Sequence, residues 1–211
     1  MARPKAPGKR IGGARSAGAA ARVCAAMLSA LAIAPAVADA ADPVTPQAVD
    51  ANAEFLAWAP APETRTKVCV VDTGVDLTTD VAGNVAARYS VYPGTVDDVG
   101  GGGIDKHGTW VAGVIASRDN DGGSVGIWPQ AEIVSVRVFA DRNSGSSVPA
   151  YLKALDACRQ ESVKVVNLSL SGLASATGPE LSALQDRITS LRDVYGTNVV
   201  AATGNNGGAV G

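Results

Sequence analysis

The chain has 211 residues, enough for one domain with a hydrophobic core of its own. Hydrophobic residues make up 46% of it and charged residues 18%, a composition that excludes an intrinsically disordered chain. Six of the 18 basic residues but only one of the 20 acidic residues fall within the first 40 positions, so residues 41–211 carry a formal charge of −7. That acidic balance argues against a nucleic-acid-binding protein.

The first forty residues differ in character from the rest. Basic residues come first, the apolar stretch VCAAMLSALAIAPAVADA follows, and Ala38-Asp39-Ala40 fits a cleavage site of the A-x-A kind. This pattern predicts a secretory signal peptide over residues 1–40, and therefore a secreted protein without stable membrane association after cleavage. An uncleaved membrane anchor is the alternative, although the apolar run is short and contains Pro35.

Residues 41–66 are rich in Pro and Ala, show no steady period and are predicted to form an N-terminal arm. From residue 67 onward, patterns typical of strands and helices alternate along the chain. Apolar, often Val-rich runs predict strands at 67–71, 87–92 (the weakest), 131–139, 163–171 and 198–202. Helices are predicted at 107–118, at 147–160, and from the capping box Thr177-x-x-Glu180 to Gly196.

The two later helices each show an apolar face with helical spacing. The face of the first consists of Val148, Tyr151, Leu152 and Leu155. The stripe of the second consists of Leu181, Leu184, Ile188 and Leu191. Two longer stretches are predicted to be loops, a flexible one at 94–105 and another at 118–130.

The alternation of strands and helices predicts an α/β fold, a mostly parallel, doubly wound sheet with helices on both faces. Ligands in such sheets bind beyond the carboxyl ends of the strands. That rule selects the positions after Val71, after Leu170 and after Ala202, and polar or Gly-rich residues follow each of them.

Two cysteines remain outside the leader. Cys69 falls in a predicted core strand and Cys158 near the end of a predicted helix. Export would permit a disulfide between them, but two buried free thiols are the favoured interpretation.

Asp72 directly follows the first predicted strand, where a carboxylate either pairs with a partner or caps the next turn. His107, the only histidine in the chain, stands at the predicted start of a helix. A lone histidine is more often structural than catalytic, but a helix start beside a strand end can hold an imidazole against a carboxylate. Asp72 would then accept a hydrogen bond from one ring nitrogen and leave the other free as a general base.

The blocks around these residues resemble the motifs of the subtilisin-like serine proteases, the subtilases of peptidase family S8. VVDTGVD resembles the aspartate motif, and HGTWVAGVIAS agrees with the histidine motif at every restricted position. AATGNNG resembles the block that carries the oxyanion-hole asparagine. The resemblance covers about residues 65–207 in the family's order and implies a subtilisin-like peptidase domain over residues 67–211.

The resemblance assigns a role to each matching residue of the catalytic blocks. Asp72 would orient His107, and His107 would act as general base and general acid. Asn205 would donate a side-chain hydrogen bond to the developing oxyanion, with Asn206 as an adjacent competitor for that role.

The segment VVNLSLSG resembles the family's substrate-binding strand. Ser169, Leu170 and Ser171 would pair with the substrate backbone by β-augmentation, so the expected partners are polypeptides. Ser171 stands where the family usually has Gly, which puts the shape of the pocket wall in doubt.

The family's serine nucleophile stands in a Gly-Thr-Ser block after the asparagine block, and these 211 residues contain no such block. The peptidase domain is therefore expected to be incomplete at its C-terminal end, and we expect no triad-dependent proteolysis from the chain as it stands. Ser124 lies in a G-x-S-x-G sequence like that of α/β hydrolases, but there the histidine follows the serine, and here it precedes.

The function implied by the resemblance is that of a secreted serine endopeptidase. The alternative is a catalytically inactive, truncated relative that acts as a peptide-binding module. No cofactor is required for the chemistry. Calcium sites are common in the family, and Asp80 or the acidic pair Asp97-Asp98 could contribute to one, although no full ligand set is legible.

Overall fold

The computed structural model describes residues 65–101, 105–120, 123–170 and 176–204. The predicted signal peptide and nearly all of the predicted N-terminal arm lie outside the described residues. The same holds for Ser171, Asn205 and Asn206.

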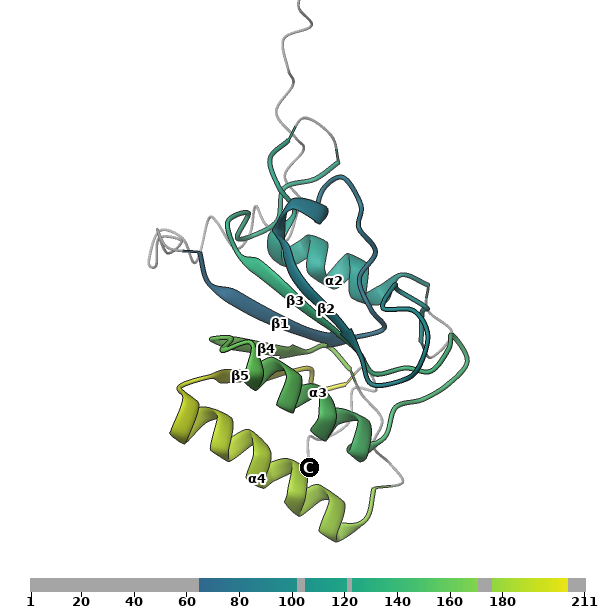
Figure 1. Ribbon diagram of the computed structural model, residues 1–211, viewed down its shortest axis with the longest axis vertical. Helices are drawn as coiled ribbons and strands as arrows, with labels where there is room; N and C mark the ends of the chain where they lie inside the picture. The colour runs from purple at the N-terminus through teal and green to yellow at the C-terminus, as the bar shows by residue number, and fades with distance from the viewer. Residues whose placement is uncertain (1–64, 102–104, 121–122, 171–175, 205–211) are drawn as a thin grey trace, which may run out of the picture. The chain divides into compact units, whose positions relative to one another are not determined.

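The described residues form one five-stranded parallel sheet (Figure 1). Its strands are β1 (Lys67–Asp72), β2 (Val85–Ser90), β3 (Glu132–Arg137), β4 (Val165–Leu168) and β5 (Asn198–Ala201). Their order across the sheet is β2-β3-β1-β4-β5, so β1 is the central strand and lies between β3 and β4. All five predicted strands are confirmed, although β4 is shorter than predicted because the chain leaves the sheet at Ser169.

In the described part of the chain, three α-helices and one short 3-10 helix accompany the sheet. They are η2 (Ala82–Asn84), α2 (His107–Ala116), α3 (Val148–Gln160) and α4 (Gly178–Tyr195). The predicted capping box of α4 is present in both directions, since Thr177 accepts from the backbone of Glu180 and the Glu180 side chain accepts from that of Thr177. Gly196 ends α4 with a φ of 62°, as its position in the sequence predicts.

The helices cover both faces of the sheet, as predicted, and Figure 1 shows α2 on the opposite side from α3 and α4. Neighbouring residues of β1 alternate between the two cores because successive strand side chains point to opposite faces. Val68 and Val70 pack in the core with α2, where the small side chains of Ala112 and Ala116 allow close approach. Cys69 and Val71 pack in the core with α3.

The predicted apolar stripe of α4 is only partly buried. Leu191 is fully buried and Leu184 and Ile188 pack against the core, but Leu181 is 47% exposed. The difference arises because α4 lies over α3 and over β5 at the edge of the described sheet, so its first turn does not reach the core.

The prediction of two free thiols is wrong, because Cys69 and Cys158 form a disulfide bond. Cys69 lies on the face of β1 that α3 covers, and Cys158 lies on the buried face of α3. The two Cα atoms are 5.7 Å apart although the residues are separated by 89 positions in the chain. Burial of both cysteines was legible from the sequence, but their meeting depends on how α3 packs across β1.

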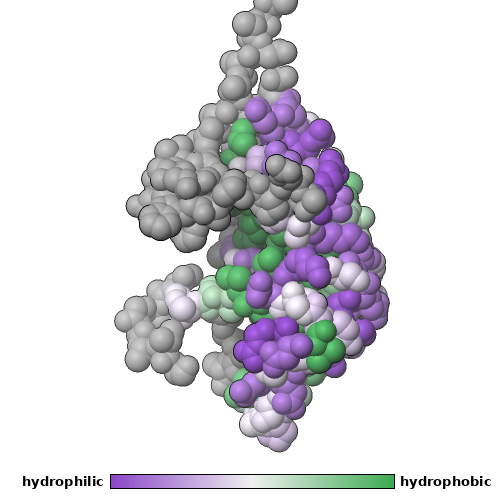
Figure 2. All heavy atoms as spheres, turned by 90° about the vertical axis from the view of Figure 1, so that its left-hand side faces the viewer, coloured by the Kyte–Doolittle hydropathy of each residue, from purple (hydrophilic) through white to green (hydrophobic). Residues whose placement is uncertain are grey.

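The amino ends of the strands lie on the left in Figure 1 and face the viewer in Figure 2, where the described residues are mainly hydrophilic. Ion pairs at this end join Lys67 to Glu161 and Arg65 to Glu132. Within the described residues, no helix combines the length and the apolar character that crossing a membrane requires.

Candidate active site

Asp72 is the last residue of β1 and is completely buried at the carboxyl end of the central strand. Its Oδ1 accepts a hydrogen bond of 2.8 Å from the backbone N–H of Thr73. A buried carboxylate is stable only where donors surround it, so the position itself calls for a further partner.

That partner is His107, the first residue of α2. The distance from His107 Nδ1 to Asp72 Oδ1 is 2.7 Å, and the imidazole side chain is 27% exposed. Because a carboxylate oxygen only accepts, Nδ1 carries the proton and Nε2 is left as the basic nitrogen of the neutral ring. The structure therefore brings together the two residues that the sequence singled out at a strand end and a helix start.

The hydrogen bond to Asp72 raises the pKa of His107 above its ordinary value of 6.5. Partial burial of the imidazole opposes this shift, and the negative charges of Asp72 and Asp98 add to it. Burial also raises the pKa of Tyr151 in α3 to about 12, and the charge of Asp72 contributes to that shift. Tyr151 is therefore neutral wherever His107 titrates.

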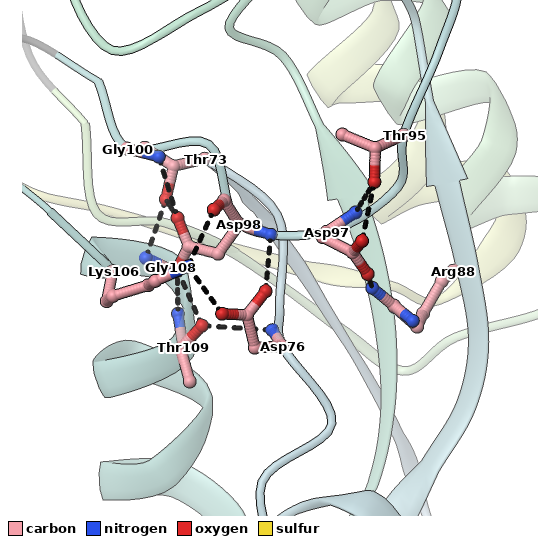
Figure 3. Close-up of polar contacts among 10 residues, drawn as sticks. All are labelled: Thr73, Asp76, Arg88, Thr95, Asp97, Asp98, Gly100, Lys106, Gly108 and Thr109. Carbon is pink, nitrogen blue, oxygen red and sulfur yellow. Dashed lines mark hydrogen bonds and ion pairs between the residues drawn. The ribbon is translucent and has the colours of Figure 1, made fainter.

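Three further residues, which sequence analysis did not assign to the site, lie next to the Asp72–His107 pair, and all three are drawn in Figure 3. Thr73, Asp98 and Thr109 are buried and joined by hydrogen bonds of 2.6 to 2.8 Å. The sequence signals were present but not decisive. Thr109 belongs to the histidine block, and Asp98 was considered only as a calcium ligand in a flexible loop.

The predicted substrate-binding segment begins where β4 ends. Ser169 and Leu170 are half-buried and follow β4, which lies between β1 and β5. Ser169 Oγ accepts from Asn167 Nδ2 at 2.9 Å. Ser171 lies outside the described residues, so only the first two residues of the segment are placed beside the end of the central strand.

The strand before the predicted oxyanion asparagine is β5, and the backbone N–H of Ala202 donates to the carbonyl of Leu168 at 3.1 Å. Gly204, with a φ of 93°, is the last residue described. Asn205 follows it directly and lies outside the described residues, so its role stays a prediction.

The residues considered for calcium are engaged by protein groups. Asp98 accepts four hydrogen bonds through its two carboxylate oxygens, and Asp97 pairs with Arg88 and Thr95. Asp80 accepts from Thr79 Oγ1 and from the backbone of Ser124. Among the described residues, no three His, Cys, Asp or Glu side chains are grouped so that they could hold a metal ion.

Ser124, the serine of the G-x-S-x-G sequence, lies in the loop after α2. A nucleophile elbow needs a strand before the serine and a helix after it, and neither flanks this position. A hollow of about 660 Å³ runs along the exposed side of α2 and is lined by Trp110, Val114, Asp80 and Ser124 among others. Neither Asp72 nor His107 lines this hollow, so it is separate from the pair.

Residues 63–210 match the sequence profile of the Subtilase family. The chain belongs to the subtilase family. Over 141 residues it is 36% identical to Subtilisin Savinase of Lederbergia lenta, a match that covers 67% of this chain and 48% of that protein. It is 30% identical over 148 residues to the Major intracellular serine protease of Bacillus subtilis (strain 168), covering 67% of this chain and 43% of the relative.

Among solved structures, this subtilase is similar to the nisin leader peptidase NisP from Lactococcus lactis. The TM-score is 0.56 at 22% sequence identity, and the match covers 69% of this chain and 45% of NisP. The likeness confirms the predicted α/β fold. The chain spans about half the length of Savinase, so the match covers only part of that relative.

Proposed function

We propose that this subtilase acts in peptide-bond hydrolysis as a serine endopeptidase. The observation that carries the proposal is the hydrogen bond of 2.7 Å between His107 Nδ1 and Asp72 Oδ1, with part of the imidazole exposed. Membership of a family of serine proteases supplies the reaction class.

In the proposed reaction, a serine hydroxyl attacks the carbonyl carbon of the scissile peptide while Nε2 of His107 takes up the hydroxyl proton. Asp72 holds the proton on Nδ1 and stabilises the imidazolium that forms. Nε2 then returns its proton to the departing amine, and water hydrolyses the acyl-enzyme by the same route. In the family, the attacking serine belongs to a Gly-Thr-Ser block, and these 211 residues contain no such block.

Two further roles belong to this proposal. Asn205 donates a hydrogen bond to the oxyanion of the tetrahedral intermediate, a contact worth about 3 kcal/mol in the transition state. Ser169, Leu170 and Ser171 form the edge along which the peptide backbone binds. The half-buried position of Ser169 and Leu170 beside the end of β1 supports this assignment.

The DNA that follows codon 211 provides the first test. An in-frame Gly-Thr-Ser-x-Ala block within about the next hundred codons is expected, because the proposed chemistry requires its serine. The protein encoded together with that block should hydrolyse peptides, and His107→Ala should lower kcat by at least about 10⁴-fold. Full activity of His107→Ala would contradict the proposal.

The 211-residue chain itself provides the second test. It is expected to show no His107-dependent peptide hydrolysis. A stop codon after position 211, together with peptide affinity that His107→Ala leaves unchanged, would favour the peptide-binding module instead. Binding measured with unstructured peptides by calorimetry separates these outcomes.

We also propose secretion, on the basis of the leader pattern in residues 1–40 and of the Cys69–Cys158 disulfide, which oxidising compartments favour. A relative named as intracellular shows that the family alone does not decide this. Recovery of the protein from the culture medium with residues 1–40 removed is the expected result. Recovery from the cytoplasm with both thiols reduced would contradict it.

A further inference from the structure

Asp98 is a buried carboxylate that the proposed reaction does not use. It is 5% exposed and belongs to the segment after β2, not to the strand or the helix that carry Asp72 and His107. Among the described residues, no lysine or arginine pairs with its carboxylate; four N–H or O–H donors surround its two oxygens instead. Hydrogen bonds to a charged carboxylate are strong, so a buried carboxylate holds the donor groups around it together.

One oxygen links Asp98 to the end of β1. Asp98 Oδ1 accepts from Thr73 Oγ1 at 2.7 Å and from the backbone of Gly100 at 3.0 Å. The same Thr73 hydroxyl accepts from the backbone of Gly108 at 2.8 Å. Thr73 follows Asp72 and Gly108 follows His107, so one hydroxyl joins the two residues next to the pair.

The other oxygen caps α2. Asp98 Oδ2 accepts from the backbone N–H of Thr109 at 2.8 Å and from its Oγ1 at 2.6 Å. The residue before the helix, Lys106, has a φ of 55° and supplies no side-chain cap. Helix starts leave backbone N–H groups unpaired and favour negative charge, so Asp98, eleven residues before Thr109, takes over the capping role that Lys106 does not fill.

The segment around Asp98 is itself held in place (Figure 3). The backbone N–H of Asp98 donates to Asp76 Oδ1 at 2.9 Å. The backbone carbonyl of Asp98 accepts from Lys106 Nζ at 3.1 Å. Next to it, Asp97 pairs with Arg88 of β2. The buried guanidinium of Arg137 donates to the carbonyls of Pro93 and Thr95 in the same segment.

We propose that Asp98 is a positioning residue, which fixes the start of α2 against the end of β1 so that His107 Nδ1 stays within hydrogen-bond distance of Asp72. Asp98 acts through Thr73 and Thr109 and does not contact the substrate. The inference rests on the proposed function only in taking the Asp72–His107 pair as the orienting part of the triad. The pair's geometry can be measured without proteolysis.

His107 is the only histidine in the chain, so its imidazole can be observed in the full 211-residue protein by NMR without overlap from others. The wild type should show a slowly exchanging Nδ1–H signal and a raised pKa for His107. Asp98→Asn replaces one oxygen by an NH₂ group, so either the Thr73 side or the Thr109 side loses its acceptor. We expect loss of the Nδ1–H signal and a pKa of His107 that falls toward 6.5.

Asp97→Asn is the matched control, because it removes the same charge from the adjacent residue but not the contacts to Thr73 and Thr109. The Nδ1–H signal should survive there. Thr177→Ala, which removes the cap of α4, lowers stability elsewhere and should also leave the signal in place. If Asp98→Asn keeps the Nδ1–H signal and only lowers the pKa of His107, Asp98 acts on His107 by its charge alone and the proposal is overturned.

If Asp98→Asn does not unfold cooperatively, the variant is not properly folded, and Thr73→Val then tests the positioning role instead. It breaks the link between Asp98 and Gly108 without changing the charge, so loss of the Nδ1–H signal supports positioning and its retention overturns it. Neither result depends on a serine nucleophile. Failure of the positioning proposal therefore leaves the proteolysis proposal standing, and the reverse also holds.

Discussion

At the scale of single residues, the pair of Asp72 and His107 depends on two backbones that approach closely. Gly108 lies so near the end of β1 that a Cβ atom added to it would stand 2.2 Å from the carbonyl oxygen of Gly74 and 3.0 Å from the Cβ of Asp72. Only a residue without a side chain fits at this position, where the start of α2 contacts the end of β1. The glycine after the histidine is therefore explained by contact rather than by helix preference.

Gly108→Ala should lower the free energy of unfolding by about 1–3 kcal/mol, because backbone atoms must move to admit the methyl group. Denaturant unfolding of the purified chain measures this. Gly113→Ala is the matched control in the same helix, since its added Cβ would meet only Ser117 Oγ at 3.2 Å. Alanine is the better helix former by about 1 kcal/mol, so a similar loss at both positions would contradict the steric explanation.

The raised pKa of His107 predicts how stability depends on pH. The protonated imidazole is favoured in the folded protein, so the contribution of the pair is fully present below the unfolded pKa of 6.5 and is lost as pH rises through the folded pKa. The difference in unfolding free energy between wild type and His107→Gln should shrink over that window. Urea titrations from about pH 5 to about pH 9 test it, and a difference that grows with pH would refute the sign.

At the scale of elements, the packing of α3 across β1 is what the sequence did not reveal. The two cysteines were correctly placed in a core strand and near a helix end, but a disulfide requires that both point into the same core. Strand alternation decides the side of the sheet on which Cys69 lies, and only the position of α3 decides which helix covers that side. The bond closes a loop of 89 positions between β1 and α3.

Replacing both Cys69 and Cys158 by Ala should cost about 2–5 kcal/mol of unfolding free energy, because the crosslink restricts the unfolded chain. Unfolding of the wild type under reducing conditions should show a loss of similar size. Alkylation of the denatured, unreduced protein provides the direct check. Two alkylated thiols at positions 69 and 158 would show that the disulfide is absent.

At the scale of the whole molecule, the described residues of the proposed site lie at one end of a parallel sheet. The strand order places β1, β4 and β5 side by side, so Asp72 at the end of β1 lies at the same end of the sheet as Ser169 and Gly204, which follow β4 and β5. In the part of the chain that the structure describes, β5 has a neighbouring strand on one side only, and Val200 on it is 54% exposed. Unpaired strand edges with apolar side chains promote association between chains.

Concentrated solutions of the 211-residue chain should therefore self-associate. Val200→Lys should weaken the association on the order of tenfold, or about 1.4 kcal/mol, because a charge at an edge disfavours pairing. Analytical ultracentrifugation measures the effect. Val194→Lys serves as control, since Val194 is 71% exposed on α4 rather than at a strand edge. Equal effects of the two substitutions would point to general hydrophobicity instead of edge pairing.

The sequence by itself determined the α/β class, the order of strands and helices, and the identity of Asp72 and His107 as a pair. These follow from local information, namely hydrophobic period, capping residues and short motifs, which neighbouring residues in the chain carry. The tertiary structure decided the Cys69–Cys158 bond, the half-exposed stripe of α4 and the burial of Asp98, which the sequence placed in a flexible loop. Each of these depends on contacts between segments far apart in the chain. Because a strand's two faces and a loop's hydrogen-bond partners are fixed only when the elements pack, no local pattern could have predicted them.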